Sequence, residues 1–161
     1  MIVLVMGVAG AGKTTLGAAL AQRLGWRFLD ADDHHPPENV AKMAAGIALD
    51  DADRRPWLDL LNGKLKEEST NSLVLACSAL KDTYRRRLLA GVVDSRIVYL
   101  HGSFALIAAR LAQRRHRYMP ASLLESQFAA LEPPAGAIAI DVAADPARCV
   151  DAIVAELQLP M

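Results

Sequence analysis

A glycine-rich stretch near the start of the chain carries the clearest chemical signal. Residues 7–14 read GVAGAGKT, a full match to the pattern G-x-x-x-x-G-K-[ST]. Glycines at these spacings let successive backbone N–H groups point inward at phosphate oxygens, and the N-terminus of a following helix adds favourable partial charge. Lys13 supplies a mobile positive charge for the β- and γ-phosphates, and the Thr14 hydroxyl suits Mg²⁺. The motif predicts binding of a nucleotide, with Mg²⁺ at Thr14.

The phosphate motif alone leaves the reaction open, because GTPases, motor ATPases and small-molecule kinases share it. Two observations favour a kinase. The chain of 161 residues has no room for a second large module, and the strand expected at residues 72–77 is followed by Ser78 where an aspartate of the Walker-B kind usually stands. The nucleotide ligands expected from the loop are Gly7, Ala9, Gly10, Ala11, Gly12, Lys13, Thr14 and Thr15.

Two carboxylates follow the second apolar segment of the chain. Asp30 and Asp32 are two residues apart, so in an extended segment both side chains point the same way. Facing the phosphate site, Asp30 would order the water shell of a Mg²⁺ ion bound by Thr14, and Asp32 would take the proton from an acceptor hydroxyl. The plainer interpretation is a solvated acidic turn that caps a helix.

Longer strings make the chain recognisable. Residues 49–58 read LDDADRRPWL and residues 77–81 read CSALK. Three further segments, 30–36, 39–43 and 126–134, belong to the same pattern. Together these strings resemble the signature of bacterial and animal gluconate kinases over nearly the whole chain. Departures from that signature are Ala31 in place of glycine, His34 in place of an apolar residue, and His116-Arg117-Tyr118 in place of Gly-His-aromatic.

The resemblance implies a reaction and a fold. The reaction would transfer the γ-phosphoryl group of ATP to the 6-hydroxyl of D-gluconate, giving 6-phosphogluconate and ADP. The fold would be the shikimate-kinase-like P-loop fold, with a helical lid expected over about residues 114–124 and often forming a homodimer. The expected partner is thus a small molecule.

An anionic polyol acceptor needs cations and hydrogen-bonding groups. Arg54, by the resemblance and by its place at a helix start, is the first candidate for the carboxylate, which a guanidinium can bind bidentately. Lys81, just beyond a strand end, is the second, and Arg85 lies one helical turn further on. His35 is expected to bind a substrate hydroxyl together with Asp32, although a structural role for His35 is equally compatible with the sequence. Each cation also has a plainer interpretation as a solvated surface group.

Two arginines near the expected lid are further candidates. Arg110 and Arg114 are four residues apart on a predicted helix, so they share one face. In related lid-bearing kinases one such arginine lies on the adenine and the other on the phosphates. By that resemblance Arg110 would bind the nucleotide and Arg114 would stabilise charge on the transferring group. Arg115 and Arg117 compete for the second role, and a solvated basic helix end is the alternative.

The elements that must position these residues alternate between strands and helices. Strands are expected over 2–6, 27–29, 72–77, 96–100 and 137–142. Helices are expected over 13–24, 37–45, 53–69, 82–90, 104–115, 122–131 and 146–157, with Asp51 or Asp53 as the N-cap of the third. Such alternation implies parallel pairing through helical crossovers. We predict one α/β domain over residues 1–161, a three-layer sandwich of about five parallel strands with ligands beyond their carboxyl ends.

Composition excludes several classes of protein. The chain has 18 Lys+Arg against 18 Asp+Glu, which argues against a nucleic-acid binder, and no apolar run approaches a membrane span. Cys77 and Cys149 are far apart and the four histidines lack zinc-ligand spacing, so a cytoplasmic protein without a disulfide scaffold is expected. The rivals are a kinase of shikimate, of another small hydroxy acid or of a nucleotide, a non-catalytic ATP-sensing module, and an RNA-binding module.

Overall fold

A five-stranded parallel sheet forms the centre of the molecule. The computed structural model describes residues 1–68, 70–113 and 121–159. The strands are β1 (Ile2–Met6), β2 (Arg27–Asp30), β3 (Leu73–Ala76), β4 (Ser95–His101) and β5 (Ile138–Asp141), in the order β2-β3-β1-β4-β5. Every neighbouring pair is parallel. The predicted α/β class and the five parallel strands are confirmed.

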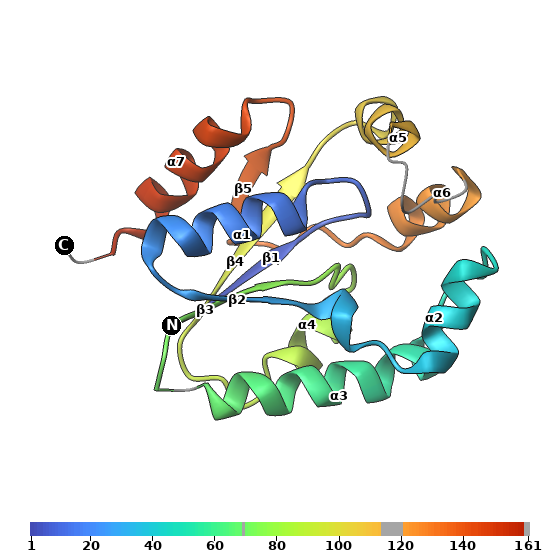
Figure 1. The fold of residues 1–161 in the computed structure, drawn as a ribbon, viewed down its shortest axis with the longest axis horizontal. Coiled ribbons are helices and arrows are strands. Elements are labelled where there is room, and N and C mark those ends of the chain that lie inside the picture. Colours follow the sequence, from blue (N-terminus) through green and yellow to red (C-terminus); the bar gives the residue numbers. More distant parts are fainter. Residues whose placement is uncertain (69, 114–120, 160–161) are drawn as a thin grey trace.

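Helices cover both faces of this sheet (Figure 1). They are α1 (Lys13–Leu24), α2 (Pro37–Ala44), α3 (Asp51–Glu67), α4 (Asp82–Leu88), α5 (Phe104–Ala112), α6 (Ala121–Ala130) and α7 (Pro146–Leu157), with a 3₁₀ turn η1 (Ala31–His34) after β2. Helices α1 and α7 lie on one side of the sheet, and α3 and α4 lie on the other (Figure 1). The three predicted layers are therefore present.

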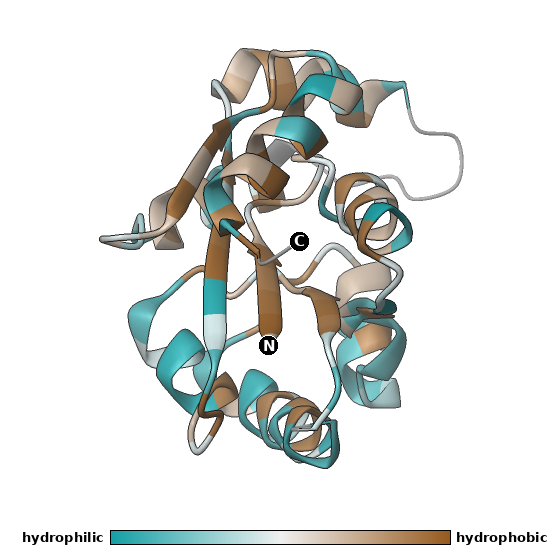
Figure 2. Ribbon diagram, turned by 90° about the vertical axis from the view of Figure 1, so that its left-hand side faces the viewer, coloured by the Kyte–Doolittle hydropathy of each residue, from teal (hydrophilic) through white to brown (hydrophobic). Residues whose placement is uncertain are grey.

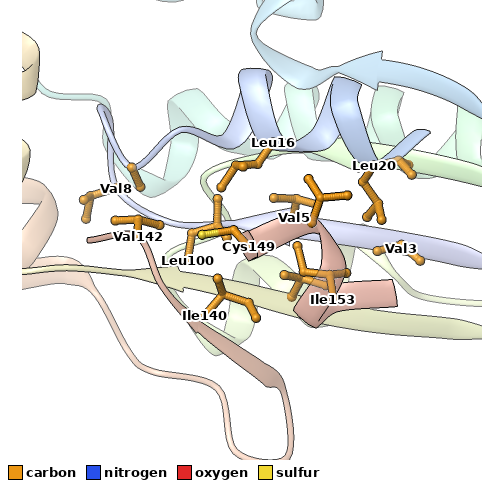
Figure 3. Close-up of a cluster of buried hydrophobic side chains, with 14 of the residues drawn as sticks. Val3, Val5, Val8, Leu16, Leu20, Leu100, Ile140, Val142, Cys149 and Ile153 are labelled. Carbon is orange, nitrogen blue, oxygen red and sulfur yellow. The ribbon is translucent and has the colours of Figure 1, made fainter. Parts of the chain in front are cut away.

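Alternate residues of β1 divide the core between the two faces, as the two-residue period of a strand requires. Val3 and Val5 belong to the cluster under α1 and α7, where Leu20 and Ile153 pack against them (Figure 3). The other cluster, under α3 and α4, contains Ile2, Leu4, Met6, Trp57, Leu61 and Leu88. Hydrophobic residues accordingly concentrate in the strands, while the outer sides of the helices are hydrophilic (Figure 2). Among the described residues, no helix combines the length and apolar character that a membrane span requires.

Local capping residues explain where α1 ends and where α3 begins. Helix α1 ends at Gly25, which adopts a left-handed conformation with φ of 70°, a frequent glycine C-cap. Helix α3 begins earlier than expected, because Asp50 is its N-cap. Asp50 accepts a hydrogen bond from the Asp53 N–H (2.7 Å), and the Asp53 carboxylate accepts one from the Asp50 N–H (3.0 Å), forming a capping box. The expectation that Asp51 or Asp53 caps this helix is therefore wrong, since Asp53 takes the reciprocal N3 position.

Candidate active site

The loop between β1 and α1 needs glycine for steric reasons. A Cβ on Gly7 would lie 2.8 Å from the Leu100 carbonyl oxygen of β4. Gly10 has φ of 82°, and a Cβ there would lie 2.7 Å from Leu111 Cγ. The sheet and α5 thus press closely against this loop. Within it, Lys13 Nζ donates a hydrogen bond to the Val8 carbonyl at 3.0 Å, so the ammonium group already lies beside the loop backbone.

The Ala9 N–H has a side-chain partner that sequence reasoning missed. Ala9 was expected to turn its N–H toward phosphate, but here it donates to Gln127 Oε1 of α6 at 2.7 Å. Residues 126–128 are part of the family-like strings, although nothing in the local pattern assigns Gln127 a contact. The phosphate loop is therefore tied to a helix more than a hundred residues away.

A cavity of about 200 Å³ opens beside the phosphate loop, between α1, α5 and the chain after β5. Its lining residues are Gly10, Ala11, Gly12, Thr15, Leu16, Arg110, Val142, Ala144, Pro146 and Cys149. Arg110 Nη2 donates to the Val142 carbonyl at 2.5 Å, which holds the guanidinium at the cavity wall. The structure thus brings Arg110 and Thr15 together with the glycines of the loop, as a nucleotide site requires.

The two expected carboxylates lie at the carboxyl end of β2, next to the phosphate loop. Asp30 Oδ2 accepts a hydrogen bond from the Thr14 hydroxyl at 2.7 Å, and Asp30 Oδ1 accepts one from the Asp32 N–H at 3.0 Å. The Asp32 side chain is 43% exposed and its Oδ1 lies 3.8 Å from His35 Nε2. Asp30 therefore faces the threonine of the loop, while Asp32 lies near His35. The expectation that both side chains point the same way from an extended segment is wrong, because β2 ends at Asp30 and Asp32 belongs to the 3₁₀ turn η1.

His35 is buried between an aromatic ring and polar partners. Its ring stacks on Trp57 with centroids 4.0 Å apart, and Asn39 Nδ2 lies 3.2 Å from its Nδ1. Because an amide nitrogen donates, Nδ1 accepts and the proton sits on Nε2, on the side of Asp32. Burial lowers the pKa of His35, against the opposing effect of the Asp32 carboxylate. His35 thus has both a structural contact and an available N–H.

Two of the expected substrate cations converge on Tyr84. Arg54 Cζ lies 5.0 Å and Lys81 Nζ 5.5 Å from the centre of its ring. Arg54 Nη1 also donates to the Tyr84 hydroxyl (3.2 Å) and to the Leu49 carbonyl (2.6 Å). Asp51 joins this group, because it accepts a hydrogen bond from the Tyr84 hydroxyl and lies 3.6 Å from Lys81 Nζ. The two cations, with Tyr84 and Asp51 that hold them, are called the cation cluster below.

The cation cluster is electrostatically coupled. The Tyr84 hydroxyl, followed by Lys81 and Arg54, lowers the pKa of Asp51. Tyr84 and Asp51 in turn raise the pKa of Lys81, which keeps its charge. Sequence reasoning found both cations but missed Tyr84 and Asp51, because their importance depends on the approach of α3 to α4.

Arg85 does not share the position of Lys81. Its side chain is buried, and Nη1 donates to the carbonyls of Ala79 (2.8 Å) and Leu80 (3.1 Å) while Nη2 donates to the carbonyl of Glu132 (2.9 Å). The guanidinium therefore supports the backbone after β3, and the expectation that it shares a substrate-facing surface with Lys81 is not met. Arg114, Arg115, Arg117 and most of the expected lid at residues 114–124 lie outside the described residues.

Comparison with known proteins decides the family. A family model described as shikimate kinase matches residues 9–130. A probable gluconokinase of Xenopus tropicalis is 43% identical, covering 98% of this chain and 92% of its own. A gluconokinase of Gluconobacter oxydans is 48% identical, covering 81% of this chain and 74% of its own. The chain belongs to the gluconokinase family.

Solved structures agree with the gluconokinase family and with its fold. A gluconokinase from Sinorhizobium meliloti superposes with a TM-score of 0.88 at 42% identity, covering 96% of this chain and 90% of that chain. Shikimate kinase from Aquifex aeolicus, at 15% identity and a TM-score of 0.58, shares the fold alone. The predicted shikimate-kinase-like P-loop fold is confirmed. In this gluconokinase-family chain, the phosphate loop follows β1 and the acidic pair lies at and just after the end of β2. The cation cluster combines Lys81, which follows β3, with side chains from the first turns of α3 and α4.

Proposed function

We propose that this chain phosphorylates D-gluconate at its 6-hydroxyl, using ATP and yielding ADP. The observation that carries the proposal is the presence of a phosphate loop and a cluster of two cations in a chain that is 48% identical to a gluconokinase. The loop matches the donor, and the cations match the carboxylate that distinguishes an aldonate from a neutral sugar. A homodimer and a cytoplasmic setting, the latter supported by the free Cys77 and Cys149, belong to the same proposal.

In the proposed donor site, the N–H groups of Gly10 and of residues 12–15 would surround the phosphates at the N-terminus of α1, while the Ala11 N–H donates to the Val8 carbonyl at 3.2 Å. Lys13 has three N–H donors, so it can keep its bond to the Val8 carbonyl while it donates to β- and γ-phosphate oxygens. Arg110, beside the cavity next to the loop, would cover the adenine. Together, these proposed contacts would hold the γ-phosphoryl group near the carboxyl end of the sheet.

Thr14 and Asp30 fit a magnesium site. A hydroxyl and a carboxylate 2.7 Å apart are oxygen donors of the kind Mg²⁺ takes, either directly or through water. No group of three or more His, Cys, Asp or Glu within the described part of the chain could hold a metal. This donor set suits an ion that keeps most of its waters and shares phosphate oxygens. When bound, Mg²⁺ would neutralise charge on the β- and γ-phosphates.

Asp32 is the proposed base in the acceptor site. A bond forms between O6 of gluconate and the γ-phosphorus while the bond from that phosphorus to the β–γ bridging oxygen breaks. The proton of the 6-hydroxyl passes to an Asp32 oxygen, and ADP leaves with the electron pair of the broken bond. His35 Nε2–H, 3.8 Å from Asp32 Oδ1, would orient the acceptor hydroxyl or the carboxylate that receives its proton.

The cation cluster is the proposed carboxylate site. Arg54 is half-buried and held by the Leu49 carbonyl and the Tyr84 hydroxyl, so its guanidinium has little freedom to lose on binding. Lys81, whose raised pKa keeps it charged, adds a second positive group over the same ring. A carboxylate arriving there competes with Asp51 for Lys81.

An acceptor panel tests the proposal. ADP release with ATP and Mg²⁺ is measured with D-gluconate, shikimate, D-glucose, L-idonate and no acceptor, for the wild type and for Lys13→Ala. We expect release with D-gluconate well above every other acceptor, and its loss in Lys13→Ala with the fold intact. Preference for shikimate would assign a different acceptor. ATP binding with no acceptor-dependent ADP release would make the chain a nucleotide sensor.

A further inference from the structure

One peptide unit of the phosphate loop is held from two sides. The Ala9 N–H donates to Gln127 Oε1 at 2.7 Å, a contact across 118 positions of the chain. The carbonyl of the same peptide unit, that of Val8, accepts a hydrogen bond from Lys13 Nζ at 3.0 Å. Because a trans peptide is planar, its N–H and its carbonyl point in opposite directions. The Val8 carbonyl also accepts a hydrogen bond from the Ala11 N–H at 3.2 Å. Gln127 therefore holds the N–H side of the Val8–Ala9 peptide, while Lys13 and the Ala11 N–H hold its carbonyl side.

This orientation affects where the charge of Lys13 lies. The lysine side chain is long and flexible, and its ammonium group is a point charge without directional preference of its own. The Val8 carbonyl gives that group a fixed anchor beside the loop. Rotation of the Val8–Ala9 peptide would move the carbonyl away and replace it by an N–H, which repels the ammonium group. A partner that holds the Ala9 N–H thus affects the position of the Lys13 ammonium group indirectly, through the Val8–Ala9 peptide.

Gln127 is well placed to be that partner, because its helix is anchored. Leu124, one turn before it, is 1% exposed and packs in the same cluster as Val8 and Leu111. Just beyond the helix, the Glu132 N–H donates to the carbonyl of Leu80 at 2.8 Å. These contacts tie α6 both to the phosphate loop and to the chain after β3. Gln127 Oε1 accordingly has a defined position relative to Ala9.

We propose that Gln127 is a positioning residue for phosphoryl transfer, which acts through the Val8–Ala9 peptide on Lys13. The proposal rests on the kinase function proposed above, and it gives a role to the family-like string at residues 126–128, for which the donor and acceptor sites have no use. Gln127 bonds to the loop backbone and acts through it. Its effect on catalysis is set by how well Lys13 meets the β- and γ-phosphates.

The test removes the acceptor oxygen while keeping the shape of the side chain. Gln127→Met preserves the length and the unbranched stem, and Gln127→Ala gives the same deletion with a strong helix former. Loss of one neutral hydrogen bond corresponds to about a two- to tenfold effect. We expect kcat to fall by that factor in both variants while KM for gluconate stays within about twofold. The matched control is Gln22→Met, on the exposed side of α1, which should change neither.

A double-mutant cycle separates positioning from a merely structural role. Affinity for ADP is measured by calorimetry for the wild type, Gln127→Met, Lys13→Ala and the double variant, without any acceptor. If Gln127 acts through Lys13, Gln127→Met weakens ADP binding about two- to tenfold when Lys13 is present and leaves it unchanged in the Lys13→Ala background. Equal losses in the two backgrounds, or no loss in either, would overturn the proposal.

The double-mutant cycle also tests the positioning role of Gln127 separately from the proposed gluconokinase activity. ADP affinity is measured without gluconate, so the cycle gives an answer even if no acceptor is phosphorylated. A wild type that binds ADP but turns over no acceptor refutes the kinase function alone. A wild type that phosphorylates gluconate, together with a cycle that shows no coupling between Gln127 and Lys13, refutes the positioning role alone.

Discussion

Thr14 Oγ1 donates a hydrogen bond to Asp30 Oδ2 at 2.7 Å, which joins the first turn of α1 to the end of β2. Strands β2 and β1 are separated by β3 in the sheet, so the contact crosses the neighbouring strand end. It brings one oxygen of the phosphate loop and one carboxylate to the place where a triphosphate would carry its metal ion. This contact supports the proposed roles of Asp30 in the magnesium site and of Asp32 at the acceptor.

Asp30→Asn should raise the Mg²⁺ concentration needed for half-maximal activity. The amide keeps an oxygen for the Asp32 N–H but removes the negative charge that stabilises the cation. ATP affinity measured without Mg²⁺ should not weaken, since no phosphate contact is lost. The measurement is a Mg²⁺ titration of kcat at saturating ATP and gluconate. An unchanged Mg²⁺ requirement would remove Asp30 from the metal site.

Asp32→Asn should lower kcat by about 10²–10⁴-fold, the usual contribution of a positioned general base. The low end of that range is favoured, because a loose phosphoryl-transfer transition state depends more on orientation than on basicity. Binding of ATP with Mg²⁺ should barely change. Asp33→Asn, at the exposed neighbouring position, is the control and should keep its activity. Rescue of the Asp32 variant by added Mg²⁺ would exchange the roles of Asp30 and Asp32.

Arg54→Ala should weaken gluconate binding far more than ATP binding. Loss of a charged hydrogen-bonding partner costs about 1.5–3 kcal/mol, or roughly tenfold to a hundredfold in affinity. The exposed neighbour Arg55→Ala supplies the control. The measurements are KM for gluconate and KM for ATP. The unfolding midpoint is recorded as well, because the variant also loses the hydrogen bond to the Leu49 carbonyl. Unchanged gluconate affinity would move the carboxylate site toward Lys81.

His35 should make the stability of the fold depend on pH. Burial against Trp57 lowers its pKa in the folded chain, whereas the unfolded chain titrates near the ordinary value of about 6.5. Between these two values the unfolded chain binds more protons, so the free energy of unfolding rises with pH across that window and falls as the solution is acidified through it. Urea unfolding at several pH values should show this slope in the wild type.

His35→Gln should flatten that slope, because it removes the group that titrates. The neighbouring His34→Gln, outside the Trp57 stack, is the control and should leave the slope in place. A slope that persists in His35→Gln would assign the pH dependence to other groups, and a His35 pKa at or above 6.5 by NMR would contradict the effect of burial.

Features with a short-range pattern could be predicted from the sequence. The phosphate loop has its whole signal within residues 7–14. The strand spacing of Asp30 and Asp32 was misleading, because β2 ends at Asp30 and Asp32 already lies in the 3₁₀ turn η1. The N-cap of α3 could not be chosen correctly, because Asp50, Asp51 and Asp53 are all good capping residues. Only the reciprocal bonds between Asp50 and Asp53 decide among them.

Contacts between distant segments had no such pattern. Arg85 looks like one of three solvated arginines in sequence, yet its side chain turns inward to three backbone carbonyls. Gln127 meets Ala9 only because α6 packs beside the loop, and Tyr84 meets Arg54 only because α4 packs against α3. In each case the partner is a backbone group or a side chain that carries no signal of its own.

Identification of the reaction product tests whether this chain phosphorylates the 6-hydroxyl of D-gluconate. Wild-type protein is incubated with ATP, Mg²⁺ and D-gluconate, and the product is examined by mass spectrometry and by proton-coupled ³¹P NMR. We expect the mass of a phosphogluconate, with a phosphomonoester signal split into a triplet by the two protons on C6. A doublet from a secondary hydroxyl, or the release of inorganic phosphate alone, would contradict it.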